Sequence, residues 1–170
     1  LGKRRENAHS LILFGPMGIR RKILAHQFAG GYLDSDKLKP RNINNLITTV
    51  SDYEESDLYH PDCHFLCPEE NKVIIGIDKS RDLKRNFFEK KSLKGKGKVG
   101  IIYPAESLHH PTVSSLLKFL EEPPDETLLI LIAESVHKLP ETVISRMQIH
   151  NIRKPSVEET VGWLDRKSVV

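Results

Sequence analysis

The chain has 170 residues and a nearly even charge balance, with 26 Lys and Arg against 23 Asp and Glu and a net charge of +3. At 38% hydrophobic and 29% charged residues, the composition is that of a globular domain, and a chain this long buries about 70% of its unfolded surface. This excludes disordered and collagen-like chains. The longest apolar run, residues 128–133, is far too short for a membrane-spanning helix.

The N-terminal residues and the cysteines indicate where in the cell the protein is expected. Residues 1–10 are polar and basic, so we expect no signal peptide. Cys63 and Cys67 are too few for a disulfide framework, which favours a reducing, cytoplasmic setting. Because residue 1 is Leu rather than Met, we expect the chain to be a fragment of a longer product.

The first third of the sequence predicts a strand, a turn and a helix. The apolar run 10–14 is typical of a buried strand, and Gly15-Pro16 ends it. Apolar residues at helical spacing predict a helix over 19–29, stopped by Gly30-Gly31. Residues 34–59 are polar, and we expect a helix there with a solvated end.

The middle of the chain predicts a strand, a further apolar run and a helix. Residues 60–68 alternate as a strand, and residues 73–77 form a second apolar run. Asp78 is a good N-cap for a helix with Leu83, Phe87 and Phe88 on its inner face. The Lys-Gly stretch 94–98 is expected to be a solvated loop, which we favour over a DNA contact.

Two continuous apolar runs, 99–103 and 128–133, are typical of strands covered on both faces, and they predict the centre of the sheet. Between them Pro111 suits the first turn of a helix that Pro123-Pro124 ends. A last helix is expected from about Ser156. The pattern indicates an α/β domain over residues 1–154, with central parallel strands, and the start of another domain at 155–170.

The turn after the first strand resembles a nucleotide-binding P-loop that has lost its key residues. The pattern G-x-x-x-x-G-K-[ST] cradles phosphates with loop amides, while its Lys reaches the terminal phosphates and its hydroxyl holds Mg²⁺. Gly15 and Gly18 remain in the turn, but Arg20, Arg21 and Lys22 replace the second Gly, the Lys and the hydroxyl residue. We therefore expect this loop to be a helix-capping turn and not a working ATP site.

The end of the strand at 99–103 indicates the same loss. A P-loop ATPase needs an Asp there for Mg²⁺ and usually a Glu that activates water. This chain has Tyr103, Pro104 and Ala105, and Glu106 is expected to be a surface residue and not a displaced base. Two altered sites in one chain argue against hydrolysis.

Three strings carry a family resemblance: 98–102 (KVGII), 116–124 (LLKFLEEPP) and 137–146 (HKLPETVISR). Together they resemble the AAA+ module of bacterial DNA polymerase III clamp-loader subunits. His60-Pro61-Asp62 followed by 75–78 (IGID) looks more like the delta prime family than the gamma/tau motor subunits. The resemblance covers roughly residues 8–164, and it implies a P-loop-like AAA+ domain followed by a helical lid.

The resemblance implies a non-hydrolysing member of a pentameric loader that places the sliding clamp on primed DNA. Its partners would be the gamma/tau and delta subunits, and ATP would be bound by those neighbours rather than by this chain. The family's Ser-Arg-Cys motif offers an arginine finger to a neighbour's ATP, and the matching residues here are Ser145, Arg146 and Met147. The alternative for Arg146 is an ordinary ion-paired residue at an element end.

The resemblance implies a four-cysteine zinc module, as in gamma/tau and many delta prime subunits, but this chain has only two cysteines. In His60-x-x-Cys63-His64-x-x-Cys67 a strand would point His64 away from both cysteines, so we expect buried strand cysteines and no metal site. Two other functions stay open: an ATP-hydrolysing AAA+ protein with unusual motifs, which nucleotide binding would reveal, and a stand-alone nucleic-acid-binding domain.

Overall fold

The computed structural model describes residues 9–16, 18, 21–33, 60–69, 72–94, 97–154 and 156, and its centre is a parallel five-stranded sheet. The strands are β1 (Ser10–Phe14), β2 (Cys63–Leu66), β3 (Lys98–Ile102), β4 (Thr127–Ala133) and β5 (Gln148–Asn151). Their order is β2-β3-β4-β1-β5, and all neighbouring pairs are parallel. The predicted α/β fold with a central parallel sheet is confirmed.

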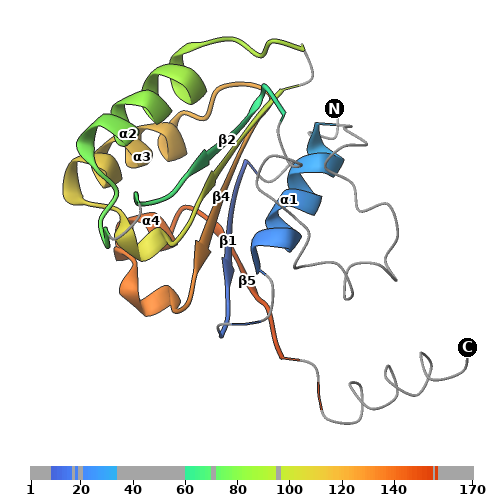
Figure 1. Ribbon diagram of the computed structural model, residues 1–170, viewed down its shortest axis with the longest axis vertical. Coiled ribbons are helices and arrows are strands. Elements are labelled where there is room, and N and C mark those ends of the chain that lie inside the picture. The colour runs from blue at the N-terminus through green and yellow to red at the C-terminus, as the bar shows by residue number, and fades with distance from the viewer. Residues whose placement is uncertain are drawn as a thin grey trace, which may run out of the picture.

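Helices cover both faces of the sheet, because parallel strands need crossover connections. They are α1 (Arg21–Tyr32), α2 (Ile77–Leu83), which runs into the π-helix η3 (Lys84–Glu89), α3 (His110–Glu121) and α4 (Glu141–Ile144). Short 3-10 turns, η4 (Ala105–Ser107) and η5 (Val136–Lys138), follow β3 and β4. In Figure 1, α1 lies on one face of the sheet and α2, α3 and α4 lie on the other.

The core has two halves, one on each face of the sheet. Successive strand residues point to opposite faces, so Leu11 and Leu13 of β1 pack toward α1 while Ile12 packs toward α3. All seven residues of β4 are buried, as expected for a central strand covered on both sides. A Cβ at Gly100 would lie 3.1 Å from the Phe87 ring, so this glycine lets a fully buried aromatic side chain pack against β3.

The helix bounds differ from the sequence predictions in two places. Helix α1 continues through Gly30-Gly31 to Tyr32, because Ala29, Gly30 and Leu33 are buried and packing outweighs the weak helix propensity of glycine. The apolar run 73–77 is only partly buried: Ile75 is buried, whereas Val73 is 83% exposed. Helix α2 begins at Ile77, which places Asp78 in its first turn and not at the N-cap.

The structure also differs from the sequence predictions at β5 and at Lys98. β5 was not predicted, because all four of its residues are exposed and its short sequence carries no alternation. Lys98 is 5% exposed and begins β3, so it is not part of a solvated loop as expected. The helices expected within 34–59 and after Ser156 lie outside the described residues, as does the side chain of Phe88.

Candidate functional site

The carboxyl ends of the strands meet the start of α1 at one edge of the sheet, where P-loop folds hold their nucleotide. Gly15 leaves β1, and Gly18 has a φ of +83°, a left-handed conformation that favours glycine. Arg21, at the position of the P-loop lysine, is only 5% exposed, and its Nη1 donates to the carbonyl of Ala133 at the end of β4. This cation is therefore bound by the protein itself.

Lys22 stands where a P-loop has its metal-binding hydroxyl, and its ammonium lies over two aromatic rings. Its Nζ is 4.4 Å from the ring centroid of Tyr103, which follows β3, and 5.8 Å from that of Phe65 on β2. Tyr103 itself occupies the place of the expected metal-binding Asp. A cation–π contact thus joins the start of α1 to the residue that follows β3.

Glu106 is half-buried and bound to the backbone, so it is not simply a surface residue as expected. Its Oε1 accepts hydrogen bonds from the backbone N–H groups of Glu134, at 2.7 Å, and Ser135, at 3.2 Å. The carboxylate therefore joins the segment after β3 to the segment after β4. Arg20 lies outside the described residues.

The second region surrounds Arg146, between α4 and β5, and its backbone is held from several sides. The N–H of Arg146 donates to Val143 at 3.1 Å, and its carbonyl accepts from Oγ of Ser10 at 3.3 Å. Met147, which replaces the cysteine of the family motif, is 8% exposed and belongs to the core. The backbone is thus anchored while the Arg146 side chain stays 38% exposed.

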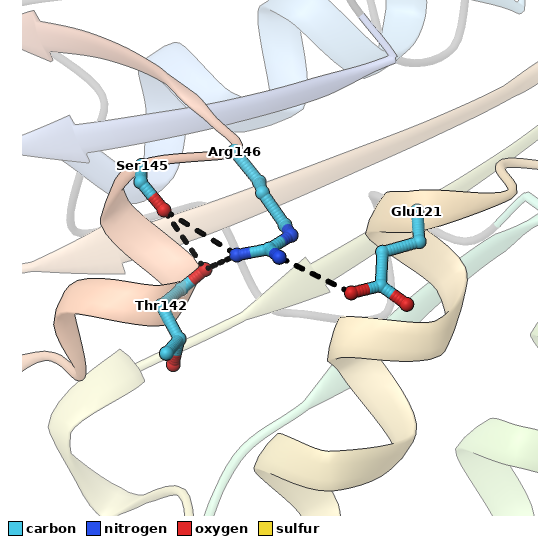
Figure 2. Close-up of polar contacts among 4 residues, drawn as sticks. All are labelled: Glu121, Thr142, Ser145 and Arg146. Carbon is cyan, nitrogen blue, oxygen red and sulfur yellow. Dashed lines mark hydrogen bonds and ion pairs between the residues drawn. The ribbon is translucent and has the colours of Figure 1, made fainter.

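Figure 2 shows the polar contacts of the Arg146 guanidinium. Nη1 donates to the carbonyl of Thr142 at 2.9 Å and lies 3.4 Å from Oγ of Ser145. Nη2 donates to Oε1 of Glu121 at 3.2 Å. Arg146 is therefore ion-paired, as the alternative to the finger role predicts, and its side chain is also partly exposed.

Glu121 lies within the string 116–124, but the sequence alone indicated no role for it. It is the last residue of α3, and 25 residues separate it from Arg146. The signal was present in the sequence as an acidic pair at the end of a helix, but only the packing of α3 beside α4 shows which acidic residue meets Arg146.

The His60-Pro61-Asp62 string lies at the opposite edge of the sheet. The Asp62 carboxylate accepts from the N–H groups of Leu93, at 2.6 Å, and Lys94, at 2.9 Å. Burial alone would raise the pKa of Asp62, but these bonds and one from Ser92 together lower it. Asp62 thus anchors the segment that enters β3.

Buried Lys98 anchors the same segment, because its ammonium donates to the carbonyls of Phe87 and Lys90. Burial lowers its pKa, and the nearby Asp62 opposes that change. The motif at this edge therefore has a structural role.

The two cysteines are free thiols and half-buried. Burial raises the pKa of Cys63 to about 12, so its thiol stays protonated and unreactive. Among the described residues, no group of three or more His, Cys, Asp or Glu side chains is arranged to hold a metal ion.

Within the same part of the chain, no helix is both long and apolar enough to cross a membrane.

Solved structures with a similar fold place the domain in a class. A DNA polymerase III gamma subunit-related protein from Thermotoga maritima has a TM-score of 0.62 and 19% identity, covering 95% of this chain and 51% of that one. RuvB from Thermotoga maritima has a TM-score of 0.54 and 17% identity, covering 94% and 43%. The chain therefore shares the fold of these proteins, a parallel sheet with helices on both faces.

Sequence comparison identifies the family. A family model described as DNA polymerase III, delta subunit matches residues 2–156. The DNA polymerase III subunit delta prime of Pseudomonas aeruginosa is 32% identical over 166 residues, 98% of this chain and 49% of that protein. The subunit delta prime of Escherichia coli is 35% identical over 108 residues, 64% and 32%. The chain belongs to the DNA polymerase III delta prime family, and it spans about half the length of the Pseudomonas relative.

Proposed function

We propose that this chain is part of a non-hydrolysing subunit of the bacterial replicative clamp loader. In this role it helps to place the sliding clamp on primed DNA, working with gamma/tau and delta subunits and binding no nucleotide of its own. The proposal includes a cytoplasmic location and a division into an AAA+ domain at 1–154 and the start of a helical lid at 155–170.

One observation supports a silent nucleotide site: two of the groups that stand at its motif positions, Arg21 and Lys22, already have partners within the protein. Arg21 is buried on the Ala133 carbonyl, and Lys22 lies over Tyr103, so phosphate and metal would have to displace intramolecular contacts. A lysine cannot coordinate Mg²⁺ as a hydroxyl does, and a tyrosine in place of the aspartate supplies no metal-binding carboxylate.

Arg146 is proposed as an arginine finger that acts on ATP held by the neighbouring subunit, with Ser145 beside it. The guanidinium is planar, permanently charged and forked, which suits it to phosphate oxygens in the transition state of hydrolysis. Its anchored backbone and half-exposed side chain support this role, because a finger must project from a rigid element.

Titration calorimetry of the full-length protein with ATP and Mg²⁺ tests the silent site. No binding is expected at millimolar nucleotide. Clear micromolar binding would overturn this part of the proposal and favour an ATP-binding subunit with divergent motifs.

Single-turnover ATP hydrolysis by the reconstituted loader tests the finger. Arginine fingers contribute about 10³-fold or more to hydrolysis, so Arg146→Ala should slow the facing site by that order. The variant should keep its melting temperature and its place in the complex. Unchanged hydrolysis in an assembled loader would refute the finger.

A further inference from the structure

The ion pair between Arg146 and Glu121 joins two side chains that both reach solvent. The side chain of Arg146 is 38% exposed and that of Glu121 is 57% exposed, at a distance of 3.2 Å between Nη2 and Oε1. The two residues come from different segments, the end of α3 and the turn after α4 (Figure 2). Half-exposed ion pairs are weak, so another anion can replace Glu121 as the partner of Arg146 at a small cost in free energy.

The remaining contacts of the guanidinium are of a different kind. Nη1 is held by the Thr142 carbonyl and by Ser145, both within four residues of Arg146 in sequence. These groups are neutral and stay beside Arg146 whatever faces its outer side. Nη2 can therefore change partner while Nη1 and the backbone remain in place.

A carboxylate and a phosphate offer the same kind of ligand to a guanidinium, namely anionic oxygens that accept charge-assisted hydrogen bonds. Glu121 thus occupies the Nη2 donor that an incoming phosphate would use. Its negative charge also lies beside the place that the phosphate would take, and like charges at this separation oppose one another.

We propose that Glu121 is a positioning residue that holds Arg146 until the nucleotide of the neighbouring subunit replaces it. The inference rests on the proposed finger role of Arg146. In this exchange the carboxylate keeps the guanidinium beside the C-terminal end of α3 while the facing site is empty. The phosphate then takes Nη2, and Glu121 turns to solvent.

The test compares two charge-matched variants of the full-length protein in the reconstituted loader, Glu121→Gln and Glu122→Gln. Glu122 is the next residue, is exposed, and makes none of the Arg146 contacts described above. The readout is ATP hydrolysis at the facing site as a function of ATP concentration. Glu121→Gln should lower KM about two- to five-fold, the strength of one exposed ion pair, with kcat changed less than about two-fold.

The control and a double variant decide between outcomes. Glu122→Gln should leave KM and kcat as in the unmodified loader, and Glu121→Gln should have no effect when combined with Arg146→Ala. A fall in kcat at constant KM would overturn the proposal, because Glu121 would then be needed in the reacting state. An equal KM change in Glu122→Gln would overturn it too, as a general effect of charge.

Failure of the finger and failure of this proposal are distinguishable. If Arg146→Ala hydrolyses ATP as the unmodified loader does, the finger role is refuted. If Arg146→Ala is slow while Glu121→Gln changes neither KM nor kcat, only the exchange is refuted. High salt screens exposed ion pairs, so the KM difference between Glu121→Gln and the unmodified protein should shrink as salt is raised.

Discussion

Arg21 and Arg146 are both cations beside a helix end, yet they are held in opposite ways. Arg21 is 5% exposed, and its guanidinium is bound to the carbonyl that ends β4. The side chain of Arg146 is 38% exposed, and its charged partner, Glu121, is more exposed still. One arginine is part of the internal structure, whereas the other can meet a ligand from outside.

The comparison teaches that a residue can stand at a motif position although its side chain is not free to bind a ligand. Arg21 stands at the position of a phosphate-binding lysine, but it is buried and donates to a carbonyl of the protein. Arg146 is also ion-paired, but its Nη2 partner is replaceable. The Arg21 side chain is thus held inside the domain, whereas the segment after α4 presents a partly exposed arginine.

The largest expected effect on stability is at Arg21. Arg21→Ala should lower the free energy of unfolding by about 2–3 kcal/mol, because a buried charged hydrogen bond and its packing are lost. Urea unfolding of the full-length protein measures it, with Arg21→Lys as a control that keeps the charge and loses less. A loss below about 0.5 kcal/mol would contradict the view that this edge is held by Arg21.

The next largest loss of stability is expected at Asp62, on the opposite edge of the sheet. Asp62→Asn should lower stability at pH 7 by about 1–2 kcal/mol, because two backbone donors lose a charged acceptor. Since the pKa of Asp62 is lowered in the folded state, its contribution is present above the pKa of the unfolded chain and is lost as the pH falls below about 4.

The variant and the unmodified protein should therefore converge in acid, as followed by thermal unfolding from pH 7 to pH 3. Asp82→Asn, at an exposed pair with Arg85, serves as the control and should change little. A difference that stays constant across this pH range would rule out the charge of Asp62 as its source.

A smaller effect is expected from the contact between Lys22 and Tyr103. A double-mutant cycle of Lys22→Ala and Tyr103→Leu should give a coupling of about 0.5–1 kcal/mol, as found for exposed cation–π contacts. Lys22→Met keeps the aliphatic stem and separates charge from packing. Additive single effects would show that the cation and the ring do not interact.

The smallest effect on stability is expected at Arg146 itself. Arg146→Ala should change the free energy of unfolding by less than about 1 kcal/mol, since an exposed pair contributes little. Urea unfolding beside Arg21→Ala tests the contrast directly. A loss as large as that of Arg21→Ala would mean that Arg146 is also structural and would remove the distinction between the two regions.

The strands and most helices could be predicted because their signal is local. The runs that became β3 and β4 are continuous apolar segments, and Pro111 and Pro123 marked both ends of α3. β5 was missed because an exposed strand of four residues is stabilised by pairing with β1 and not by its own pattern. The end of α1 was placed too early, because the burial of Gly30 depends on the sheet beneath it.

The sequence by itself determined the fold class and the family, and it predicted the loss of the nucleotide motifs, since each depends on residue types at fixed spacing. It also singled out Arg146. Only the tertiary structure decided that Arg21 is bound to Ala133, that Lys22 meets Tyr103 and that Glu121 holds Arg146. These contacts join residues 25 to 112 positions apart. No local pattern encodes such pairs, because the packing of helices on the sheet brings them together.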